Sequence, residues 1–178
     1  MAKPTRQLIL GGVRSGKSRL AEQLAREAGG PVTYIATAQA GDAEMASRIA
    51  AHRLQRPADW QTVEPGMALG AALRKADCAD RVVLVDCLTL WLTQILCATD
   101  ADTLLEAEKA SLLAAVRQVR GRLILVANET GLGIMPMDAL SRRFGDEAGR
   151  LHQELAAICE RVVLIAAGLP LVLKGEPL

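Results

Sequence analysis

The stretch Gly11-Gly12-Val13-Arg14-Ser15-Gly16-Lys17-Ser18 follows directly on the short apolar run Leu8-Ile9-Leu10. It has the G-x-x-x-x-G-K-S spacing of a P-loop, in which backbone N–H groups curl around phosphate oxygens. In such a loop Lys17 adds a positive charge for the outer phosphates, and the Ser18 hydroxyl can bind Mg²⁺. The stretch therefore predicts a nucleotide site between a strand and a helix.

Apolar residues behind this loop recur at helical spacing, at Leu20, Ala21, Leu24, Ala25 and Ala28. The order strand, loop, helix is the context that a P-loop requires, and the helix N-terminus adds partial positive charge where phosphates would lie. The alternative is a glycine-rich turn that merely joins a strand to a helix. Full agreement between motif and context favours the nucleotide site.

Apolar, strand-like runs recur along the chain, at residues 7–10, 32–36, 81–85, 123–127 and 162–166. Helical patterns lie between most of them, at 17–28, 42–55, 67–76, 89–97, 103–119 and 138–160, and the last could break near Gly145 or Gly149. Residues 170–175 can add a final edge strand. This alternation predicts an α/β fold with a parallel sheet covered on both faces, formed by one domain over residues 1–178.

The chain of 178 residues is 51% apolar, has a formal net charge of +1, and contains only two Trp, one Tyr and one Phe. An aliphatic core is expected, and neither a broad basic surface nor stacking aromatics indicate nucleic acid as a partner. No apolar stretch suits a signal peptide or a membrane span, so we expect a cytoplasmic protein that acts on small molecules. Cys78, Cys87, Cys97 and Cys159 lack C-x-x-C spacing and are expected to be reduced packing residues.

Polar residues follow the ends of the predicted strands, where ligands gather in open parallel sheets. Asp86 ends the apolar run 81–85 in the manner of a Walker B strand, whose carboxylate holds Mg²⁺ directly or through water. The alternative is that Asp86 caps the helix that follows. The P-loop in the same sheet favours the metal role, and Ser18 and Asp86 are the predicted Mg²⁺ ligands.

One of the two histidines lies among arginines on the predicted helix 42–55. Arg48 and His52 are four residues apart and share a face, Arg56 follows on that stripe, and Arg53 lies alongside. These cations are expected to lower the pKa of His52 and to keep its imidazole neutral and nucleophilic, so that it could accept a phosphoryl or nucleotidyl group. Spacing alone favours the alternative, a solvated histidine on a basic face. His152 is expected to be structural by the same reasoning.

Taken together, these stretches resemble the bifunctional adenosylcobinamide kinase/adenosylcobinamide-phosphate guanylyltransferase family of cobalamin biosynthesis. The resemblance covers nearly the whole chain. It rests on GGVRSGKS (11–18), YIATAQ (34–39), DAEMASRIAAHRLQRPADW (42–60), VDCLTLWL (85–92), NETGLGIMP (128–136), RRFGDEAGRLHQ (142–153) and the ending AGLPLVLKG. The most specific features are the helix ending H-R-x-x-R-P-x-x-W and the segment N-E-x-G-x-G-x-x-P.

The resemblance implies a RecA-like P-loop NTPase fold and two activities. One phosphorylates the aminopropanol hydroxyl of adenosylcobinamide with a nucleoside triphosphate, ATP or GTP. The other passes GMP from GTP, through a guanylylated His52, to adenosylcobinamide phosphate, which gives adenosylcobinamide-GDP. Some relatives have two adjacent histidines where this chain has Ala51-His52, so a single nucleophile is left here.

The resemblance also implies Mg²⁺, a corrinoid substrate, and a homo-oligomer, which is a trimer in the enteric members. Lys17 would act with His52 in catalysis by stabilising charge on phosphorus oxygens. The nucleotide-binding residues that follow are Gly11, Gly12, Val13, Arg14, Ser15, Gly16, Lys17, Ser18, Ala36, Thr37, Ala38, Arg53, Leu54, Gln55, Arg56, Glu64 and Asp86.

Other functions stay open at this point. The chain could be a simple P-loop kinase for a small metabolite, without a covalent step, or a nucleotide-gated switch that hydrolyses its nucleotide slowly. Residues 128–136 are either a corrinoid-facing or intersubunit loop or a plain turn between a strand and a helix. Arg142 and Arg143 either reach substrate phosphate or lie on a solvated helix face.

Overall fold

The computed structural model describes residues 5–41 and 43–178, without the side chains of Met45, Arg48, His52, Leu54 and Gln55. The strands are β1 Arg6–Gly11, β2 Val32–Ala36, β3 Gln61–Val63, β4 Val82–Asp86, β5 Arg122–Asn128, β6 Arg161–Ala166 and β7 Leu169–Lys174. The helices are α1 Lys17–Ala28, α2 Ala43–Gln55, α3 Leu69–Ala76, α4 Leu88–Leu96, α5 Ala101–Gln118 and α6 Ala139–Ile158. Asp42, at which the prediction began the second helix, lies outside the described residues.

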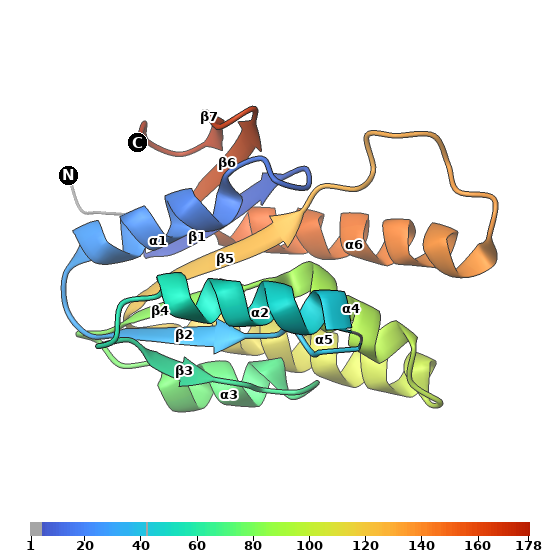
Figure 1. Cartoon of the computed structure of the whole chain (residues 1–178), viewed down its shortest axis with the longest axis horizontal. Helices are drawn as coiled ribbons and strands as arrows, with labels where there is room; N and C mark the ends of the chain where they lie inside the picture. Colours follow the sequence, from blue (N-terminus) through green and yellow to red (C-terminus); the bar gives the residue numbers. More distant parts are fainter. Residues whose placement is uncertain (1–4, 42) are drawn as a thin grey trace.

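Over these described residues the strands form one seven-stranded sheet in the order β3-β2-β4-β5-β1-β6-β7. Neighbouring strands are parallel except for β6 and β7, an antiparallel pair at the sheet edge. The register sets Ala36 beside Asp86 and Gly11 beside Asn128. The carboxyl ends of β1, β2, β4 and β5 therefore meet at one edge of the sheet (Figure 1).

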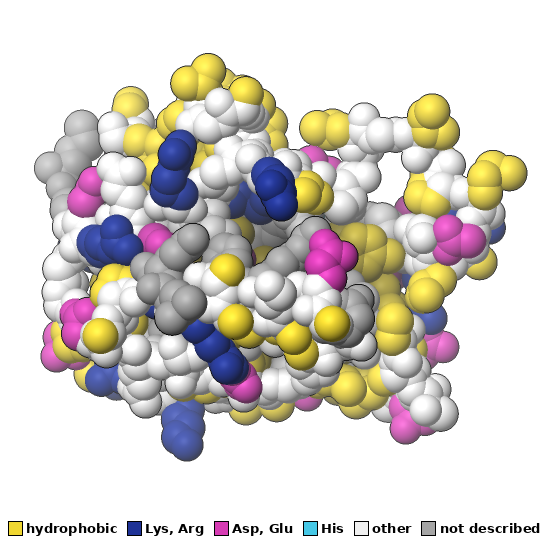
Figure 2. Space-filling view, in the orientation of Figure 1, with side chains coloured by type: hydrophobic (Ala, Val, Ile, Leu, Met, Phe, Trp, Pro, Cys, Tyr) yellow, Lys and Arg dark blue, Asp and Glu magenta, His cyan; other side chains and the backbone are white. Residues whose placement is uncertain are grey.

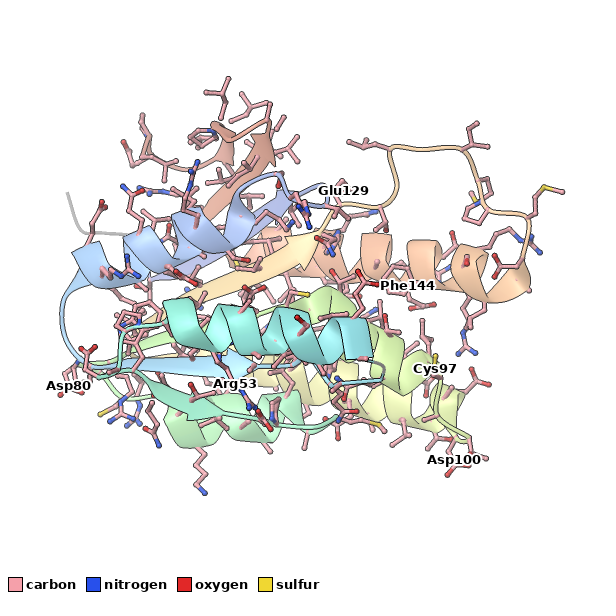
Figure 3. The ribbon with its side chains drawn as sticks, in the orientation of Figure 1. Arg53, Asp80, Cys97, Asp100, Glu129 and Phe144 are labelled. Carbon is pink, nitrogen blue, oxygen red and sulfur yellow. The ribbon has the colours of Figure 1, made fainter. Side chains whose placement is uncertain are left out.

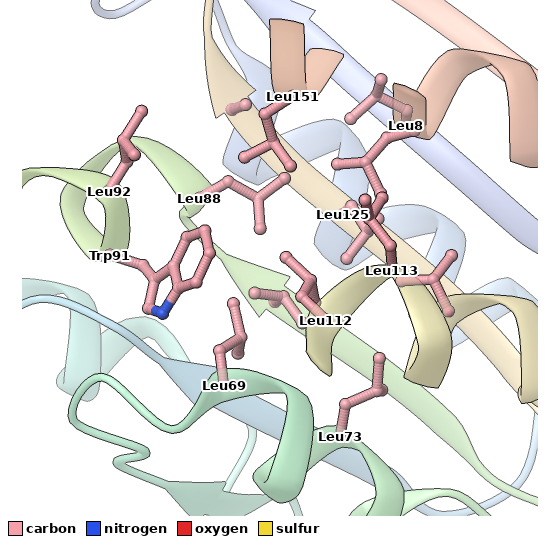
Figure 4. Packing of buried hydrophobic residues seen from close by; sticks show 14 of the residues in the cluster. Leu8, Leu69, Leu73, Leu88, Trp91, Leu92, Leu112, Leu113, Leu125 and Leu151 are labelled. Carbon is pink, nitrogen blue, oxygen red and sulfur yellow. The ribbon is translucent and has the colours of Figure 1, made fainter. Parts of the chain in front are cut away.

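Both faces of the sheet are covered, as the continuous apolar strands predict. Successive residues of β1 enter different cores, since Leu8 and Leu10 pack with α3, α4, α5 and α6, whereas Ile9 packs with α1. The larger core is mostly leucine around the buried Trp91 (Figure 4), whose indole N–H donates to the carbonyl oxygen of Met67 at 2.7 Å. The expected α/β fold with an aliphatic core is confirmed.

The observed secondary structure differs from the prediction at two places. Helix α6 is continuous through Gly145 and Gly149, because both glycines have open space around them while Ala148, Leu151 and Leu155 pack into the core. Packing of that face offsets the cost of about 1 kcal/mol per helical glycine. Strand β3 was not predicted, because its three residues are too few for a period to be visible.

The cysteines follow the prediction only in part. All four are free thiols, as expected, and Cys87 and Cys159 are buried. Cys78 and Cys97 are exposed, which corrects their assignment as packing residues, because Cys78 lies in the loop after α3 and Cys97 directly follows α4. Among the described residues, no helix combines the length and the apolar character that crossing a membrane requires.

Candidate active site

A cavity of about 640 Å³ lies where the carboxyl ends of β1, β2, β4 and β5 meet. Several residues that the sequence predicts as nucleotide contacts line it together. They are Val13, Arg14, Ser15, Gly16, Lys17, Ser18, Ala36, Ala38, Arg56, Glu64 and Asp86. The structure thus brings the P-loop, the strand-end carboxylate and the residues that follow α2 to one place.

The P-loop has the tight backbone that its glycines permit. Gly16 directly precedes α1 with φ of 103°, a left-handed conformation that suits glycine. A Cβ on Gly11 would lie 2.5 Å from the carbonyl oxygen of Ile165, so this position also has no room for a side chain. Lys17 is buried, and its Nζ donates to the carbonyl oxygen of Gly12 at 2.8 Å, which holds the ammonium against the loop.

The turn between β6 and β7 supports the P-loop from behind. The backbone N–H of Gly168 donates to the carbonyl oxygen of Ser15 at 2.9 Å, and the Gly168 Cα is in van der Waals range of a Cβ built on Gly16. The Ser15 hydroxyl oxygen is buried and has no hydrogen-bond partner among the described atoms. An unpaired polar group of this kind in a glycine-rich loop suits a bound polar ligand.

Asp86 lies at the tip of β4 beside Lys17. Burial lowers the pKa of Lys17, and the nearby Asp86 and Cys87 partly oppose this effect. The cap position of α4 is Cys87, without a side-chain cap, so the alternative role of Asp86 as a helix cap is wrong. The buried Thr37 hydroxyl donates to the Cys87 carbonyl oxygen at 2.6 Å and accepts from the Cys87 N–H at 2.8 Å, which fixes this strand end.

The oxygen donors in the cavity fit Mg²⁺. Asp86 supplies a carboxylate and Ser18 a hydroxyl, and both line the cavity beside Lys17. Magnesium takes hard oxygen ligands, and with nucleotides it uses one or two protein groups together with phosphate oxygens and water. No cluster of three or more His, Cys, Asp or Glu that could hold a metal alone occurs in residues 5–41 and 43–178. A nucleotide-dependent Mg²⁺ site is consistent with this donor set.

Helix α2 and Arg56, the residue that follows it in the sequence, form the other wall of the cavity. Ile49 and Ala51 of α2 line it, and so does Arg56, whose Nε and Nη1 are buried without a hydrogen-bond partner among the described atoms. Arg53 does not line this cavity. Its side chain runs from α2 toward β3 and forms an ion pair with Glu64 (Figure 3).

A second cavity of about 590 Å³ adjoins the first, since Ala38, Ile49 and Glu64 line both. Arg53 borders this second cavity. The predicted site side chains of His52, Leu54 and Gln55 lie outside the described part of α2. Gly11, Gly12 and Thr37 are not among the residues that line the first cavity.

The segment 128–136 has two different parts. Asn128 lines the cavity, whereas the residues from Thr130 to Leu140 are exposed, including Leu132, Ile134, Met135 and Met137. This segment arches away from the sheet, and its apolar side chains project at the upper right of Figure 2.

The remaining predicted candidates have partners away from the cavity. Arg142 donates to the carbonyl oxygens of Pro136 and Met137, and Arg143 forms an ion pair with Asp102. His152 is buried near Glu129, and burial lowers its pKa, which agrees with a structural role.

Sequence reasoning missed Tyr34 as a site residue. Its hydroxyl donates to Asp86 Oδ2 at 2.9 Å, and its ring lies under the Arg56 guanidinium, with Cζ 3.7 Å from the ring centroid. Tyr34 is the only tyrosine of the chain and lies in a buried strand, where an aromatic residue is unremarkable. The signal that could have identified it is the phenol hydroxyl of Tyr34, a polar group in a fully buried strand that ends at the predicted site.

Comparison with known proteins gives the family. The family model described as cobinamide kinase / cobinamide phosphate guanyltransferase matches residues 7–173. The chain belongs to this family. It is therefore an enzyme of the kinase and nucleotidyltransferase classes that acts in cobalamin biosynthesis, and a nucleoside triphosphate is a substrate.

Relatives of known function share almost its whole length. The bifunctional adenosylcobalamin biosynthesis protein CobP of Pseudomonas aeruginosa is 60% identical over 173 residues, which cover 97% of this chain and 99% of the relative. The bifunctional adenosylcobalamin biosynthesis protein CobU of Escherichia coli is 39% identical over 179 residues, which cover 94% of this chain and 98% of the relative.

Solved structures share the fold at low sequence identity. A Pyrococcus horikoshii protein matches 97% of this chain and 87% of its own, with a TM-score of 0.53 and 9% identity. An ATPase of a bacterial type III secretion system matches 94% of this chain and 56% of its own, with a TM-score of 0.50 and 11% identity. The expected RecA-like P-loop NTPase fold is thereby confirmed.

Proposed function

We propose that this enzyme phosphorylates adenosylcobinamide and then transfers GMP from GTP, through a guanylyl-His52 intermediate, to adenosylcobinamide phosphate. The product of the second reaction is adenosylcobinamide-GDP. The observation that supports this most is that one cavity is lined by the P-loop, by Asp86, by Ile49 and Ala51 of α2 and by Arg56, which follows α2. One bound nucleotide can therefore be reached both from the P-loop and from α2.

In the kinase reaction, the substrate hydroxyl oxygen attacks the γ-phosphorus, loses its proton, and the nucleoside diphosphate leaves. The P-loop backbone and Lys17 hold the phosphates, and Lys17 stabilises the negative charge that develops on their oxygens. Ser18 and Asp86 would hold Mg²⁺, which when bound neutralises charge on the β- and γ-phosphates. The buried, low-dielectric position of Lys17 strengthens its interaction with phosphate.

In the guanylyl reaction, a neutral ring nitrogen of His52 attacks the α-phosphorus of GTP. A phosphorus–nitrogen bond forms, the bond from the α-phosphorus to the bridging oxygen breaks, and pyrophosphate leaves. A phosphate oxygen of adenosylcobinamide phosphate then attacks the same phosphorus and frees the imidazole. The covalent intermediate divides one transfer into two in-line steps and keeps GMP in place between them.

The helical position of residue 52 supports this role. Successive residues of an α-helix are about 100° apart around its axis. Position 52 therefore falls between positions 49 and 51 around α2, and Ile49 and Ala51 both line the cavity. Arg56 adds unpaired N–H donors to the same wall, and these suit phosphate oxygens.

The test is to incubate the enzyme with GTP labelled at the α-phosphorus and to denature it. We expect label on the protein that is stable in base and lost in acid. The label should move to the corrinoid when adenosylcobinamide phosphate is added before the enzyme is denatured. His52→Ala should abolish the label and keep most of the kinase activity, because Lys17, Ser18 and Asp86 remain. His152→Gln is the matched control, since it removes the other histidine and should leave the label in place.

Other results would decide for other functions. A wild-type enzyme that phosphorylates cobinamide without taking up label would be a simple P-loop kinase. Slow nucleotide hydrolysis that does not respond to corrinoid would indicate a nucleotide-gated switch. Equal loss of both activities in folded His52→Ala would contradict separate roles for the P-loop and α2.

Further features belong to the same proposal. Residues 1–178 would act as one nucleotide-binding domain in the cytoplasm. Its partner would be the small-molecule substrate adenosylcobinamide, and nucleic acid would not be a partner. The chain would form a homo-oligomer, a trimer by resemblance. Exposed apolar residues such as Leu132 and Ile134 support a role of the segment after β5 in contacting corrinoid or another subunit. Gel filtration with light scattering tests the oligomer.

A further inference from the structure

Tyr34 contacts two charged groups of the cavity at once. It lies in the middle of β2 with 2% of its surface exposed, and its hydroxyl donates to Asp86 Oδ2 at 2.9 Å. The Cζ atom of Arg56 lies 3.7 Å from the centroid of the same ring. One side chain thus contacts both Asp86, at the end of β4, and Arg56, the residue that follows α2 in the sequence.

The hydroxyl of Tyr34 restricts the carboxylate of Asp86. A hydrogen bond to an ionised acceptor is stronger than one between neutral groups, and here it engages one named oxygen, Oδ2. A phenol carries its proton at neutral pH, so the Tyr34 hydroxyl is the donor in this hydrogen bond. The carboxylate is therefore held in one orientation, with Oδ1 left for a metal ion or its water.

The ring of Tyr34 restricts Arg56 in a different way. A guanidinium over an aromatic face is attracted by the ring quadrupole and keeps its N–H groups available at its edge. Nε and Nη1 of Arg56 are indeed buried without a partner among the described atoms. Trp60 supports the tyrosine, with ring centroids 6.4 Å apart, and Arg26 in turn lies over Trp60. The tyrosine ring is thus a fixed platform for the arginine.

We propose that Tyr34 is a positioning residue that orients the Asp86 carboxylate through its hydroxyl and the Arg56 guanidinium through its ring, so that both act on one bound triphosphate. This inference rests on the proposed function of the cavity. The two contacts have effects on nucleotide binding that can be measured separately. The hydroxyl governs how Mg²⁺ strengthens nucleotide binding, and the ring governs how tightly the nucleotide binds without Mg²⁺.

Tyr34→Phe removes the hydroxyl and keeps the ring. The measurement is binding of a fluorescent GTP analogue over a titration of magnesium chloride, starting from EDTA. In EDTA, we expect the nucleotide affinity of the variant to be within about twofold of that of wild type. The Mg²⁺ midpoint, which is the Mg²⁺ concentration that gives half of the gain in nucleotide affinity, should rise by about five- to tenfold. A shift of this size corresponds to the loss of one charge-assisted hydrogen bond. An unchanged Mg²⁺ midpoint would overturn the role of the hydroxyl.

Thr33→Val is the matched control, because it removes a buried hydroxyl from the same strand. Thr33 is 1% exposed and accepts from Arg81 Nη1 at 3.2 Å, outside the cavity. We expect its Mg²⁺ midpoint to equal that of wild type. A shift in Thr33→Val as large as that in Tyr34→Phe would mean that general loosening of β2 causes the effect, and would contradict the inference.

Two further variants test whether Tyr34 acts through its partners. In an Asp86→Asn background, Tyr34→Phe should change the Mg²⁺ response by less than about twofold, since the oriented group is already lost. Tyr34→Leu should weaken nucleotide binding in EDTA as well, and in an Arg56→Ala background it should add little. If the effects of the two substitutions simply add in either double variant, Tyr34 does not act through that partner, and the corresponding part of the inference is wrong.

These binding measurements separate the inference from the proposed function. If no guanylyl-enzyme forms but Tyr34→Phe shifts the Mg²⁺ midpoint, Tyr34 positions the nucleotide site of a kinase and the guanylyl proposal fails alone. If the guanylyl-enzyme forms and the midpoint does not move, the proposed function stands and the inference about Tyr34 fails.

Discussion

Helices α1 and α2 border the same cavity, but the core holds them very differently. Lys17, Ala21 and Ala25 of α1 are buried against the sheet. None of the described side chains of α2 is buried, and Ile49 is the one among them that is half-covered. Both helices lie on the same face of the sheet (Figure 1). The phosphate-binding end is therefore built into the core, whereas the described side chains of α2 add little to it.

This contrast corresponds to the two reactions. The proposed kinase chemistry uses the P-loop, Lys17 and Asp86, and this end of the sheet is fixed by hydrogen bonds from Gly168, Thr37 and Tyr34. In the proposed guanylyl reaction, α2 would present His52 at the α-phosphorus, and bound nucleotide, corrinoid or another subunit would add contacts that fix α2. The comparison predicts that changes on α1 affect both reactions and that changes on α2 affect one.

The largest expected effect is that of Lys17→Ala. Removing a buried charge that stabilises developing negative charge should lower kcat/KM of both the kinase and the guanylyl reaction by about 10²–10³-fold. Steady-state kinetics with adenosylcobinamide and with adenosylcobinamide phosphate measures each reaction. Lys75→Ala, an exposed lysine in the last turn of α3, is the control and should be close to wild type. A variant that loses only one reaction would break the assignment of a shared phosphate site.

An intermediate effect is expected in amide hydrogen exchange. Without nucleotide, amides of α2 should exchange at least about tenfold faster than those of the second half of α1, because elements with little buried apolar surface open at lower cost. GTP with Mg²⁺ should slow exchange in α2 more than in α1. Equal protection of the two helices in the free enzyme would contradict the contrast between them.

The smallest effect is expected at the opposite end of the sheet, where Arg6 and Glu160 form an ion pair. The backbone N–H of Arg6 also donates to Glu160 Oε2 at 2.6 Å. Burial raises the pKa of Glu160, but hydrogen bonds from Arg6 outweigh this and lower it below its ordinary value. The folded state therefore gains stability above the ordinary carboxyl pKa and loses it as the pH falls through the lowered value.

Glu160→Gln should reduce the free energy of unfolding by about 0.5–1 kcal/mol at pH 7, a small value because solvent screens a pair this exposed. Urea unfolding at pH 7 and at pH 3 measures the difference, which should shrink at the lower pH. Kinase activity should stay within about twofold of wild type. A loss of activity without a loss of stability would contradict the separation of the two ends of the sheet.

What the sequence could predict is local. The P-loop predicts its own strand, turn and helix, and Asp86 is found because it ends a continuous apolar run. These residues lie at strand ends, and the parallel topology alone brings them together. The predicted end of α2 at residue 55 is the observed one, because Pro57 disfavours helical backbone in the residue before it.

What the sequence could not predict depends on packing between distant segments. Tyr34 and Asp86 are 52 residues apart, and their contact needs both the β2–β4 register and the burial of the ring. The stacking of Arg56 on Tyr34 depends on how the chain turns after α2. The continuity of α6 through two glycines likewise depends on the face that its other residues bury.

The most direct test is a crystal structure with Mg²⁺ and a GTP analogue whose bridge between the α- and β-phosphates cannot be cleaved. The account predicts the triphosphate in the P-loop and a ring nitrogen of His52 about 3–3.5 Å from the α-phosphorus, opposite the bridging group. A ring that faces solvent away from the nucleotide, with no hinge able to bring it to the α-phosphorus, would contradict the proposed guanylyl transfer.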